Sequence, residues 1–226
     1  MIEGPQRRAD VQDDLRVLLV DDHDLFRTGL RNLLEEQGLR VVGEAATGEQ
    51  AVRSVRELAP DVVVMDLNMP GISGVDATRQ ITAEAPLTRV VVLTISDQDG
   101  DVMDAILAGA CGYLLKDATI ESVVAGIRSA AVGASLISPT IASKVLQRVR
   151  STTADTEMAN AIRAELSDRE LEVLKLIANG KDNAQIAAEL VISPKTVKNH
   201  ISNILMKLQI QNRIQAAVYA VRSGLA

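Results

Sequence analysis

The first half of the chain alternates short apolar runs with longer segments of helical periodicity. The runs are apolar on both faces, as in strands that are covered from both sides. Such strands, separated by helix-length crossovers, predict a doubly wound α/β domain with a five-stranded parallel sheet. The predicted strands are Arg16–Val20, Val41–Ala45, Val62–Met65, Val90–Leu93 and Tyr113–Leu115, and the predicted helices span about 24–37, 48–58, 74–84, 98–109 and 119–132.

The second half of the chain contains only helical signals after about residue 164. Residues 139–150 predict one amphipathic helix, and the small polar residues 151–156 predict a linker. We therefore expect three parts, which are an α/β domain over 15–135, a partly helical linker over 136–163 and a small all-α domain over 164–226.

Capping signals mark the helix starts of this all-α domain. Ser167 and Glu170 form a capping box, and Asp182 is suited to cap a second helix. Ser193 is followed by Pro194, which is a typical cap with proline in the first helical position. These signals predict helices over about 167–178, 182–190, 193–208 and 211–222.

Composition excludes several classes of protein. One Phe, two Tyr and no Trp argue against the aromatic platforms on which single-stranded nucleic acids stack. A single cysteine, Cys111, allows no internal disulfide, fits a reducing cytoplasm and, with two histidines, argues against structural zinc. No apolar run approaches the roughly 20 residues that span a bilayer, and residues 1–14 predict a loose polar tail instead of a signal peptide. We expect a cytoplasmic protein with no membrane partner.

The net charge of −6 is unevenly distributed along the chain. Residues 1–135 carry 12 Lys and Arg against 22 Asp and Glu, whereas residues 136–226 carry 12 against 8. An acidic half beside a mildly basic half suggests two domains with different partners, one of them nucleic acid. Chance variation on two solvated surfaces is the alternative, and charge alone does not exclude it.

Acidic and polar residues follow the predicted strands at one edge of the sheet. Asp21 and Asp22 come after the first strand and Asp66 after the third, while Thr94 and Lys116 follow the fourth and fifth. The carboxyl ends of parallel strands meet at one edge, which is where such sheets bind ligands. Clustered carboxylates repel one another, and a divalent cation with oxygen ligands removes that conflict. The sequence therefore predicts a Mg²⁺ site beside a lysine and a hydroxyl group.

This set of groups suits phosphoryl transfer. A metal ion and a lysine neutralise charge on the transferring phosphoryl group, and a carboxylate accepts it as an aspartyl phosphate. We predict that Asp66 is the phosphoacceptor and that the turn at Pro70 and Gly71 directs the main-chain carbonyl of Asn68 to the metal. His23 is interpreted as a helix-start residue and not as a phosphate carrier. The alternative is that the strand-end acids only cap the following helices.

Residues 15–135 resemble the receiver domain of two-component response regulators, which has a flavodoxin-like fold. The resemblance implies Mg²⁺ as cofactor, a sensor histidine kinase as phosphodonor, and a switch in which a hydroxyl and an aromatic side chain move. Many receivers place proline after the lysine, where this chain has Asp117. The matching residues are the metal ligands Asp21, Asp22, Asp66 and Asn68, with Asp66 also the phosphoacceptor, the switch residues Thr94 and Tyr113, and the phosphate-contacting Lys116.

The turn before Ser193 and the helix after it predict a helix-turn-helix unit. No acidic residue occurs from Ser193 to Leu208, and donors lie in the first turns of that helix. This pattern suits phosphates and base edges in a major groove of double-stranded DNA, although a solvated polar helix face is the alternative. The candidate DNA-binding residues are Lys195, Thr196, Lys198, Asn199, His200, Ser202 and Lys207.

Residues 164–226 resemble the LuxR-type helix-turn-helix domain of the NarL/FixJ family of response regulators. The resemblance implies that Lys198 and Asn199 lie at base edges, and Ser202 stands where some members carry a base-reading lysine. It places Thr196, His200 and Lys207 at the DNA backbone or in helix packing. The matching runs are Leu166–Leu174, Asn183–Ala187 and Thr196–Leu205.

Members of this family bind DNA as dimers. The last predicted helix is therefore either the dimer contact or part of the domain core, and the sequence favours neither. Its apolar residues are Ala216, Ala217, Val218, Ala220 and Val221.

The two resemblances together predict a DNA-binding response regulator, not an enzyme, in which phosphorylation of Asp66 promotes dimerisation and sequence-specific DNA binding. A Mg²⁺-dependent phosphohydrolase is the first alternative. Such an enzyme needs a second acid two residues after its nucleophile, and this chain has Asn68 there. A receiver that ignores phosphate and binds DNA constitutively is the second alternative.

Overall fold

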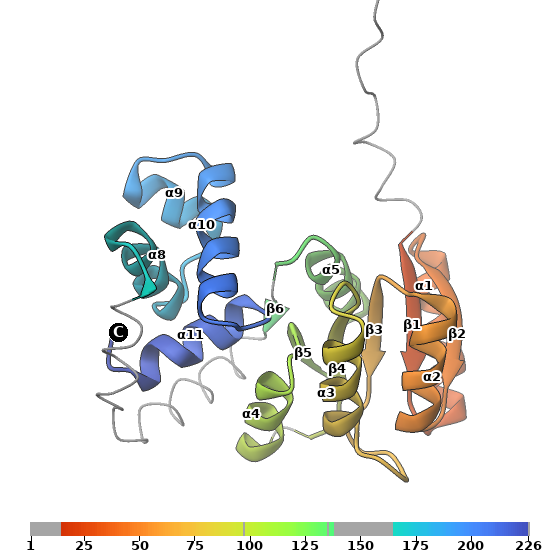
Figure 1. The fold of residues 1–226 in the computed structure, drawn as a ribbon. Coiled ribbons are helices and arrows are strands. Elements are labelled where there is room, and N and C mark those ends of the chain that lie inside the picture. The colour runs from red at the N-terminus through yellow and green to blue at the C-terminus, as the bar shows by residue number, and fades with distance from the viewer. Residues whose placement is uncertain (1–14, 97, 135, 138–164, 226) are drawn as a thin grey trace, which may run out of the picture. The chain divides into compact units, whose positions relative to one another are not determined.

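The structure is a computed structural model of a chain that forms two compact units, divided between Ile137 and Ser138 (Figure 1). The predicted helix over 139–150 and the predicted linker over 151–156 lie outside the residues that the structure describes, which are 15–96, 98–134, 136–137 and 165–225.

The first unit has strands and helices in strict alternation, as the sequence predicts. Each predicted strand and helix of this unit is present, and its ends differ from the prediction by at most two residues. The strands are β1 (Arg16–Val20), β2 (Arg40–Ala45), β3 (Val62–Met65), β4 (Arg89–Thr94), β5 (Gly112–Leu115) and β6 (Leu136–Ile137), and the helices are α1 (Asp24–Glu36), α2 (Gly48–Leu58), α3 (Gly74–Glu84), α4 (Asp99–Leu107) and α5 (Ile120–Ala131).

The sheet is parallel throughout, with the strand order β2-β1-β3-β4-β5-β6. The order reverses between β1 and β3, which makes the edge beyond these two strands the expected ligand-binding crevice. Strand β6 is an addition to the five predicted strands, because two residues carry no periodicity signal. It pairs with β5 through Leu136 and Gly112, so residues 136–137 belong to the sheet and not to the expected linker.

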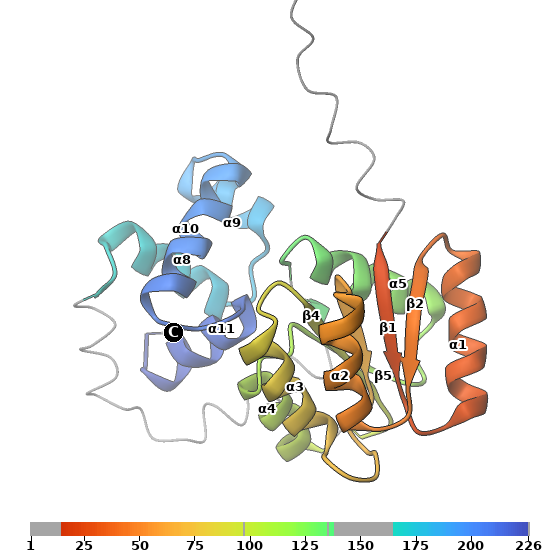
Figure 2. The ribbon, with the colours of Figure 1, turned by 45° about the vertical axis from the view of Figure 1, so that its right-hand side comes forward.

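Alternate residues of each central strand face opposite layers of helices, since side chains in a strand alternate between its two faces. Val17, Leu19 and Val64 pack with α1 and α5, whereas Leu18 and Val63 pack with α2 and α3. Figures 1 and 2 show the sheet between these helix pairs. Burial on both faces explains why the strands read as continuous apolar runs.

The second unit is all helical in its described part. Ser167 and Glu170 form the predicted capping box, Asp182 caps the next helix, and Ser193 with Pro194 opens the third. Among the described ranges, no helix has the length and apolar character needed to cross a membrane. The helices are α8 (Asp168–Ala178), α9 (Asn183–Leu190), α10 (Pro194–Lys207) and α11 (Arg213–Arg222).

Candidate functional site

Carboxylates gather where the two central strands end. Asp21 follows β1 and Asp66 follows β3, and these strands are hydrogen-bonded neighbours with Val20 opposite Met65. The Asp21 and Asp66 side chains are nearly inaccessible, since the residues are 5% and 2% exposed. Ligand atoms of four residues lie within 4.8 Å of one another, namely those of Asp21, Asp22, His23 and Asp66.

Lys116 connects the two buried carboxylates. Its Nζ lies 2.6 Å from Asp21 Oδ2 and 2.8 Å from Asp66 Oδ2. Burial favours the neutral amine, but the hydrogen bonds to the two carboxylates outweigh it, and the pKa of Lys116 is raised. The ammonium also lies 4.6 Å from the centre of the Phe26 ring. Lys116 is therefore a cation that holds the two acids together.

The backbone after β3 engages the other oxygen of Asp66. Leu67 N donates to Asp66 Oδ1 at 2.7 Å, and Asn68 N lies 3.5 Å from the same atom. Each Asp66 oxygen thus has a separate donor set, which fixes the carboxylate in one orientation. Asn68 follows Asp66 by two residues, and the contact of its main chain with a metal stays a prediction.

Asp22 and His23 complete the cluster on its exposed side. Asp22 Oδ1 is buried and accepts no hydrogen bond. It lies 2.8 Å from His23 Nδ1, and this contact is an ion pair only when the imidazole is protonated. His23 is the N-cap of α1, in agreement with its interpretation as a helix-start residue, but sequence reasoning missed its contact with both acids.

The donor set fits a hard divalent cation. Oxygen atoms of three carboxylates converge, one of them is buried without a hydrogen bond, and none of the four clustered residues is a thiolate. Mg²⁺ prefers such oxygen ligands and retains waters or phosphate oxygens in its remaining positions. Asp21, Asp22 and Asp66, with the main chain of Asn68, are the residues that would hold it.

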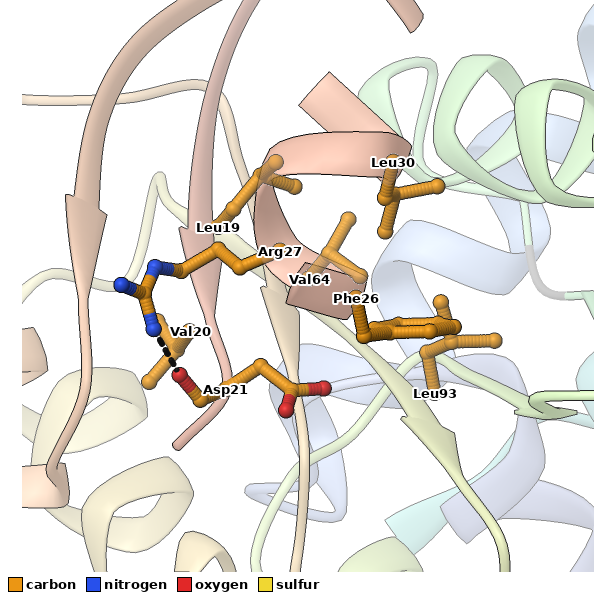
Figure 3. Close-up of a pocket in the computed structure, with 8 residues that line it drawn as sticks. All are labelled: Leu19, Val20, Asp21, Phe26, Arg27, Leu30, Val64 and Leu93. Atoms are coloured by element: carbon orange, nitrogen blue, oxygen red, sulfur yellow. Dashed lines mark hydrogen bonds between the residues drawn. The ribbon is translucent and has the colours of Figure 1, made fainter. Parts of the chain in front are cut away.

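Arg27 supports the site from α1 and was missed by sequence reasoning. Its Nη1 donates to the main-chain oxygen of Asp21 at 2.5 Å, and its Nε donates to Glu44 Oε2 on β2 at 2.9 Å. Figure 3 shows the guanidinium hydrogen-bonded to that oxygen, and Arg27 lines a small pocket together with Phe26 and Leu93. The sequence signal is weak, because an arginine near the start of a helix is ordinary.

The predicted switch residues converge on Ser96. The Thr94 side chain is fully buried, and its Oγ1 lies 3.4 Å from Ser96 N. Tyr113 is also fully buried, and its hydroxyl donates to Ser96 O at 2.9 Å, so its ring points inward. Ser96 in turn donates to Asp101 on α4. Sequence reasoning missed Ser96, which carries no motif of its own.

The predicted DNA-binding residues lie on α10 of the second unit. Lys195, Lys198, Asn199 and Ser202 are exposed. Thr196 is half-buried, and its hydroxyl pairs with Ser193 at the cap. The other two candidates are His200, which is half-buried, and Lys207, which ends the helix.

Lys207 has a structural partner. Its Nζ lies 2.7 Å from Glu170 Oε2, and the Glu170 side chain is 5% exposed. The same carboxylate accepts from Ser167 N at 2.8 Å as part of the capping box. The pair joins the end of α10 to the start of α8, which favours helix packing over a DNA-backbone contact among the two roles left open for Lys207.

This pair makes the stability of the second unit sensitive to acid. Burial opposes ionisation of Glu170, but the bonds from Lys207 and Ser167 outweigh it and lower its pKa below the ordinary 4.5. Its contribution is therefore complete above that value and is lost as the pH falls through the folded-state pKa. We expect the calorimetric Tm of the full chain's helical unit to exceed that of Glu170→Gln at neutral pH, with the gap closing in acid. A gap that is independent of pH would contradict this account.

Helix α11 contributes mainly to the core of its own unit. Ala216 and Ala220 belong to the buried cluster that includes Val173, Leu174 and Ile177 of α8. Of the five apolar residues named from the sequence, Ala216, Val218 and Ala220 are buried, while Ala217 and Val221 are half-buried. Ala216 and Ala220 belong to the buried cluster of the unit, and Ala217 and Val221 pack against it, so the structure favours the core role over the dimer contact for these four.

Comparison with known proteins assigns a class to each unit. Residues 17–128 match the family model of the response regulator receiver domain. Residues 164–220 match the model of bacterial regulatory proteins of the luxR family. The carboxylate cluster at the strand ends thus lies within the residues matched by the first model, and the helix-turn-helix lies within those matched by the second.

Relatives match along nearly the whole chain. The transcriptional regulatory protein LiaR of Bacillus subtilis (strain 168) is 46% identical over 213 residues, which cover 93% of this chain and 99% of LiaR. A nitrate/nitrite response regulator protein homolog of Haemophilus influenzae is 40% identical over 209 residues, which cover 92% of this chain and 97% of the length of that homolog. The crystal structure of response regulator ChrA, from a heme-sensing two-component system, is 35% identical, covers 95% of this chain and 100% of that chain, and has a TM-score of 0.52.

The chain belongs to the NarL/FixJ-type response regulators, in which a receiver domain is followed by a LuxR-type DNA-binding domain. The predicted family and the predicted fold class are confirmed. The protein is a two-component response regulator and a DNA-binding regulator of transcription.

Proposed function

We propose that Asp66 accepts a phosphoryl group from a sensor histidine kinase in a Mg²⁺-dependent reaction. The observation that carries the proposal is the bridge from Lys116 to Asp21 and Asp66, beside Asp22 Oδ1, a buried oxygen that accepts no hydrogen bond. Three carboxylates with a single lysine leave excess negative charge at one point. A divalent cation would offset that imbalance and, together with Lys116, would neutralise the negative charge that an incoming phosphoryl group adds.

Asp66 and Lys116 have different roles in the phosphoryl transfer. An Asp66 oxygen attacks phosphorus, the phosphorus–nitrogen bond of the donor phosphohistidine breaks, and the imidazole nitrogen leaves with the electron pair and takes up a proton. Lys116 is already within 2.8 Å of Asp66 and neutralises charge on the group as it arrives. Mg²⁺, when bound, supplies further neutralisation of the phosphoryl oxygens.

The site favours a persistent aspartyl phosphate over rapid hydrolysis. A phosphohydrolase with an aspartate nucleophile requires a second acid to move a proton, and position 68 supplies an amide. Asn68 has no titratable group, so it does no general acid–base work. A long-lived adduct suits a switch, and the protein acts as a regulator instead of an enzyme.

We further propose that phosphorylation shifts the chain toward a homodimer that binds specific DNA sequences in the cytoplasm. Thr94 and Tyr113 meet at Ser96, and Ser96 contacts Asp101, so a movement of the Thr94 hydroxyl reaches α4 through direct contacts. A tenfold gain in DNA affinity requires only ~1.4 kcal/mol of coupling. If the protein instead bound DNA regardless of phosphate, this series of contacts would have no role in signalling.

Replacing Lys198 or Asn199 with alanine tests the DNA contact. Both side chains are exposed on α10, and the loss of a base contact typically costs about 1–3 kcal/mol. We expect each variant to lose roughly tenfold or more in affinity for a duplex selected from random sequences with the wild-type protein, as measured by fluorescence anisotropy at fixed salt. Lys175→Ala removes an exposed lysine from α8 and is the matched control. Equal losses in Lys198→Ala and Lys175→Ala, with no loss in Asn199→Ala, would indicate general charge attraction and no base readout.

A further inference from the structure

The loop from Asp66 to Gly74 connects β3 to α3 and carries the phosphoacceptor at its start. It is held at its far end by the first turn of α2, which lies outside the carboxylate cluster. Glu49 Oε1 accepts a hydrogen bond from Ile72 N at 3.0 Å. This bond spans 23 residues of sequence, so it ties the loop to a separate helix.

The loop and the start of α2 touch without room for extra side-chain atoms. Gly71 has a φ of +85°, and a Cβ built there would lie 2.6 Å from Glu49 Oε1. A Cβ on Gly48 would lie 2.7 Å from the Ile72 main-chain oxygen. Two glycines therefore permit the approach that lets the Glu49 carboxylate reach the Ile72 amide.

The Glu49 carboxylate is well suited to this role. Hydrogen bonds from its own N–H and then from Ile72 N lower its pKa, so it remains ionised at neutral pH. A charged acceptor forms a stronger hydrogen bond than a neutral one. The contact is thus more than a passive consequence of the loop's path.

The position of Ile72 constrains the site because only a short segment of main chain separates Ile72 from Asp66. Leu67 N and Asn68 N both approach Asp66 Oδ1, so the backbone that leaves Asp66 is already tied to its carboxylate. The remaining freedom of the loop lies between Asn68 and Ile72, and the Glu49 bond removes it at the far end. The main chain of Asn68 is therefore held between two fixed points.

We infer that Glu49 is a positioning residue for the metal site, which acts through the Ile72 amide to hold the main chain of Asn68 in place for Mg²⁺. The inference rests on the proposed Mg²⁺-dependent function of Asp66. Residues that orient metal ligands from outside the ligand set commonly change metal affinity by about 10–100-fold when they are removed.

Two other roles would account for Glu49 without any link to the metal. An acid in the first turn of a helix interacts favourably with the helix dipole, whichever residue it contacts. Alternatively, the apolar side chains of Met69 and Ile72, which pack on the core, hold the loop unaided. The first role requires a charge at position 49, and the second requires nothing there.

Three substitutions separate these roles. Glu49→Gln keeps an acceptor oxygen at the same reach but removes the charge. Glu49→Asp keeps the charge at the helix start, but its shorter side chain does not reach Ile72 N. Glu49→Ala removes both, and Glu57→Ala removes an exposed carboxylate from the same helix as the matched control. Mg²⁺ affinity is measured by isothermal titration calorimetry on the full chain, and loop protection by hydrogen–deuterium exchange of the peptide that spans 66–74.

We expect Glu49→Ala and Glu49→Asp to bind Mg²⁺ roughly tenfold more weakly, which is the lower end of the range for such residues, and to exchange faster within 66–74. Glu57→Ala should match wild type in both measurements, and Glu49→Gln, which keeps the acceptor oxygen but loses the charge, should weaken Mg²⁺ binding less than Glu49→Ala or Glu49→Asp. The inference is overturned if Glu49→Asp behaves as wild type while Glu49→Gln does not, if all three Glu49 variants match wild type, or if the wild-type chain binds no Mg²⁺.

Failure of the proposed function gives a different result. In that case the wild-type chain binds Mg²⁺ but takes no phosphoryl group from a small-molecule donor, while the Glu49 series still separates in affinity and exchange. The metal readout therefore decides the role of Glu49, and the mass of the phosphoryl adduct decides the role of Asp66.

Discussion

Replacing Asp66 with asparagine is expected to abolish phosphoryl uptake completely while the chain remains folded. Asparagine has nearly the same shape, but its amide is not a nucleophile that forms an acyl phosphate. The substitution also removes one of three clustered carboxylates, so thermal stability should be unchanged or higher. Intact mass after incubation with Mg²⁺ and a small-molecule phosphodonor measures the adduct, and light scattering on the same samples measures dimerisation.

The control for this result is Asp104→Asn, which neutralises an exposed aspartate on α4. We expect this variant and the wild type to gain one acid- and base-labile phosphoryl group and to dimerise. A labile adduct that survives in Asp66→Asn would place phosphorylation at another residue, and the exposed His23 imidazole would be examined first. If neither the wild type nor Asp104→Asn takes up a phosphoryl group, the result would instead favour the constitutive DNA-binding alternative.

Replacing Gly74 with alanine is expected to cause the second large effect, through a direct clash at the phosphoacceptor. A Cβ on Gly74 would lie 2.0 Å from the Asp66 main-chain oxygen and 2.7 Å from Leu67 Cα. Both neighbours are backbone atoms, so neither is able to rotate away. Overpacking typically costs about 1–3 kcal/mol, and we expect a loss of about 3 kcal/mol in the free energy of unfolding.

The clash should also displace Asp66, since Gly74 N donates to Leu67 O at 3.0 Å and the two ends of the loop are coupled there. We therefore expect phosphoryl uptake to fall at least tenfold at temperatures where the variant is still folded, as measured by denaturant unfolding and by intact mass. Gly29→Ala is the matched control, because no atom lies within 4 Å of a Cβ at that position on α1. It should stabilise the chain by ~0.5–1 kcal/mol. Similar losses in both variants would show that the cost is not local to Asp66.

The elements of this protein were predictable because each is encoded within a short window. Strands covered on both faces read as continuous apolar runs, and the caps at Ser167, Asp182 and Ser193 mark helix starts where the structure has them. The exception is β6, whose two residues form a strand only by pairing with β5. A strand of that length has no periodicity for a sequence to display.

The candidate site was predictable in part, for a topological reason. Asp21, Asp66 and Lys116 each follow a parallel strand, and such strands deliver their carboxyl ends to one edge regardless of loop details. Sequence order alone therefore brought these residues together. It did not reveal Arg27, Ser96 or the imidazole contact of His23, which depend on side-chain direction and on hydrogen bonds across elements.

The sequence by itself determined the order of strands and helices, the cluster of acids at the sheet edge, and the family to which the chain belongs. Only the tertiary structure decided which atoms meet, such as Lys207 with Glu170 and Glu49 with Ile72. The physical reason is that periodicity and capping are local properties of a few neighbouring residues. Contacts between residues 23 or 37 positions apart depend on how whole elements pack, and no short stretch of sequence contains that information.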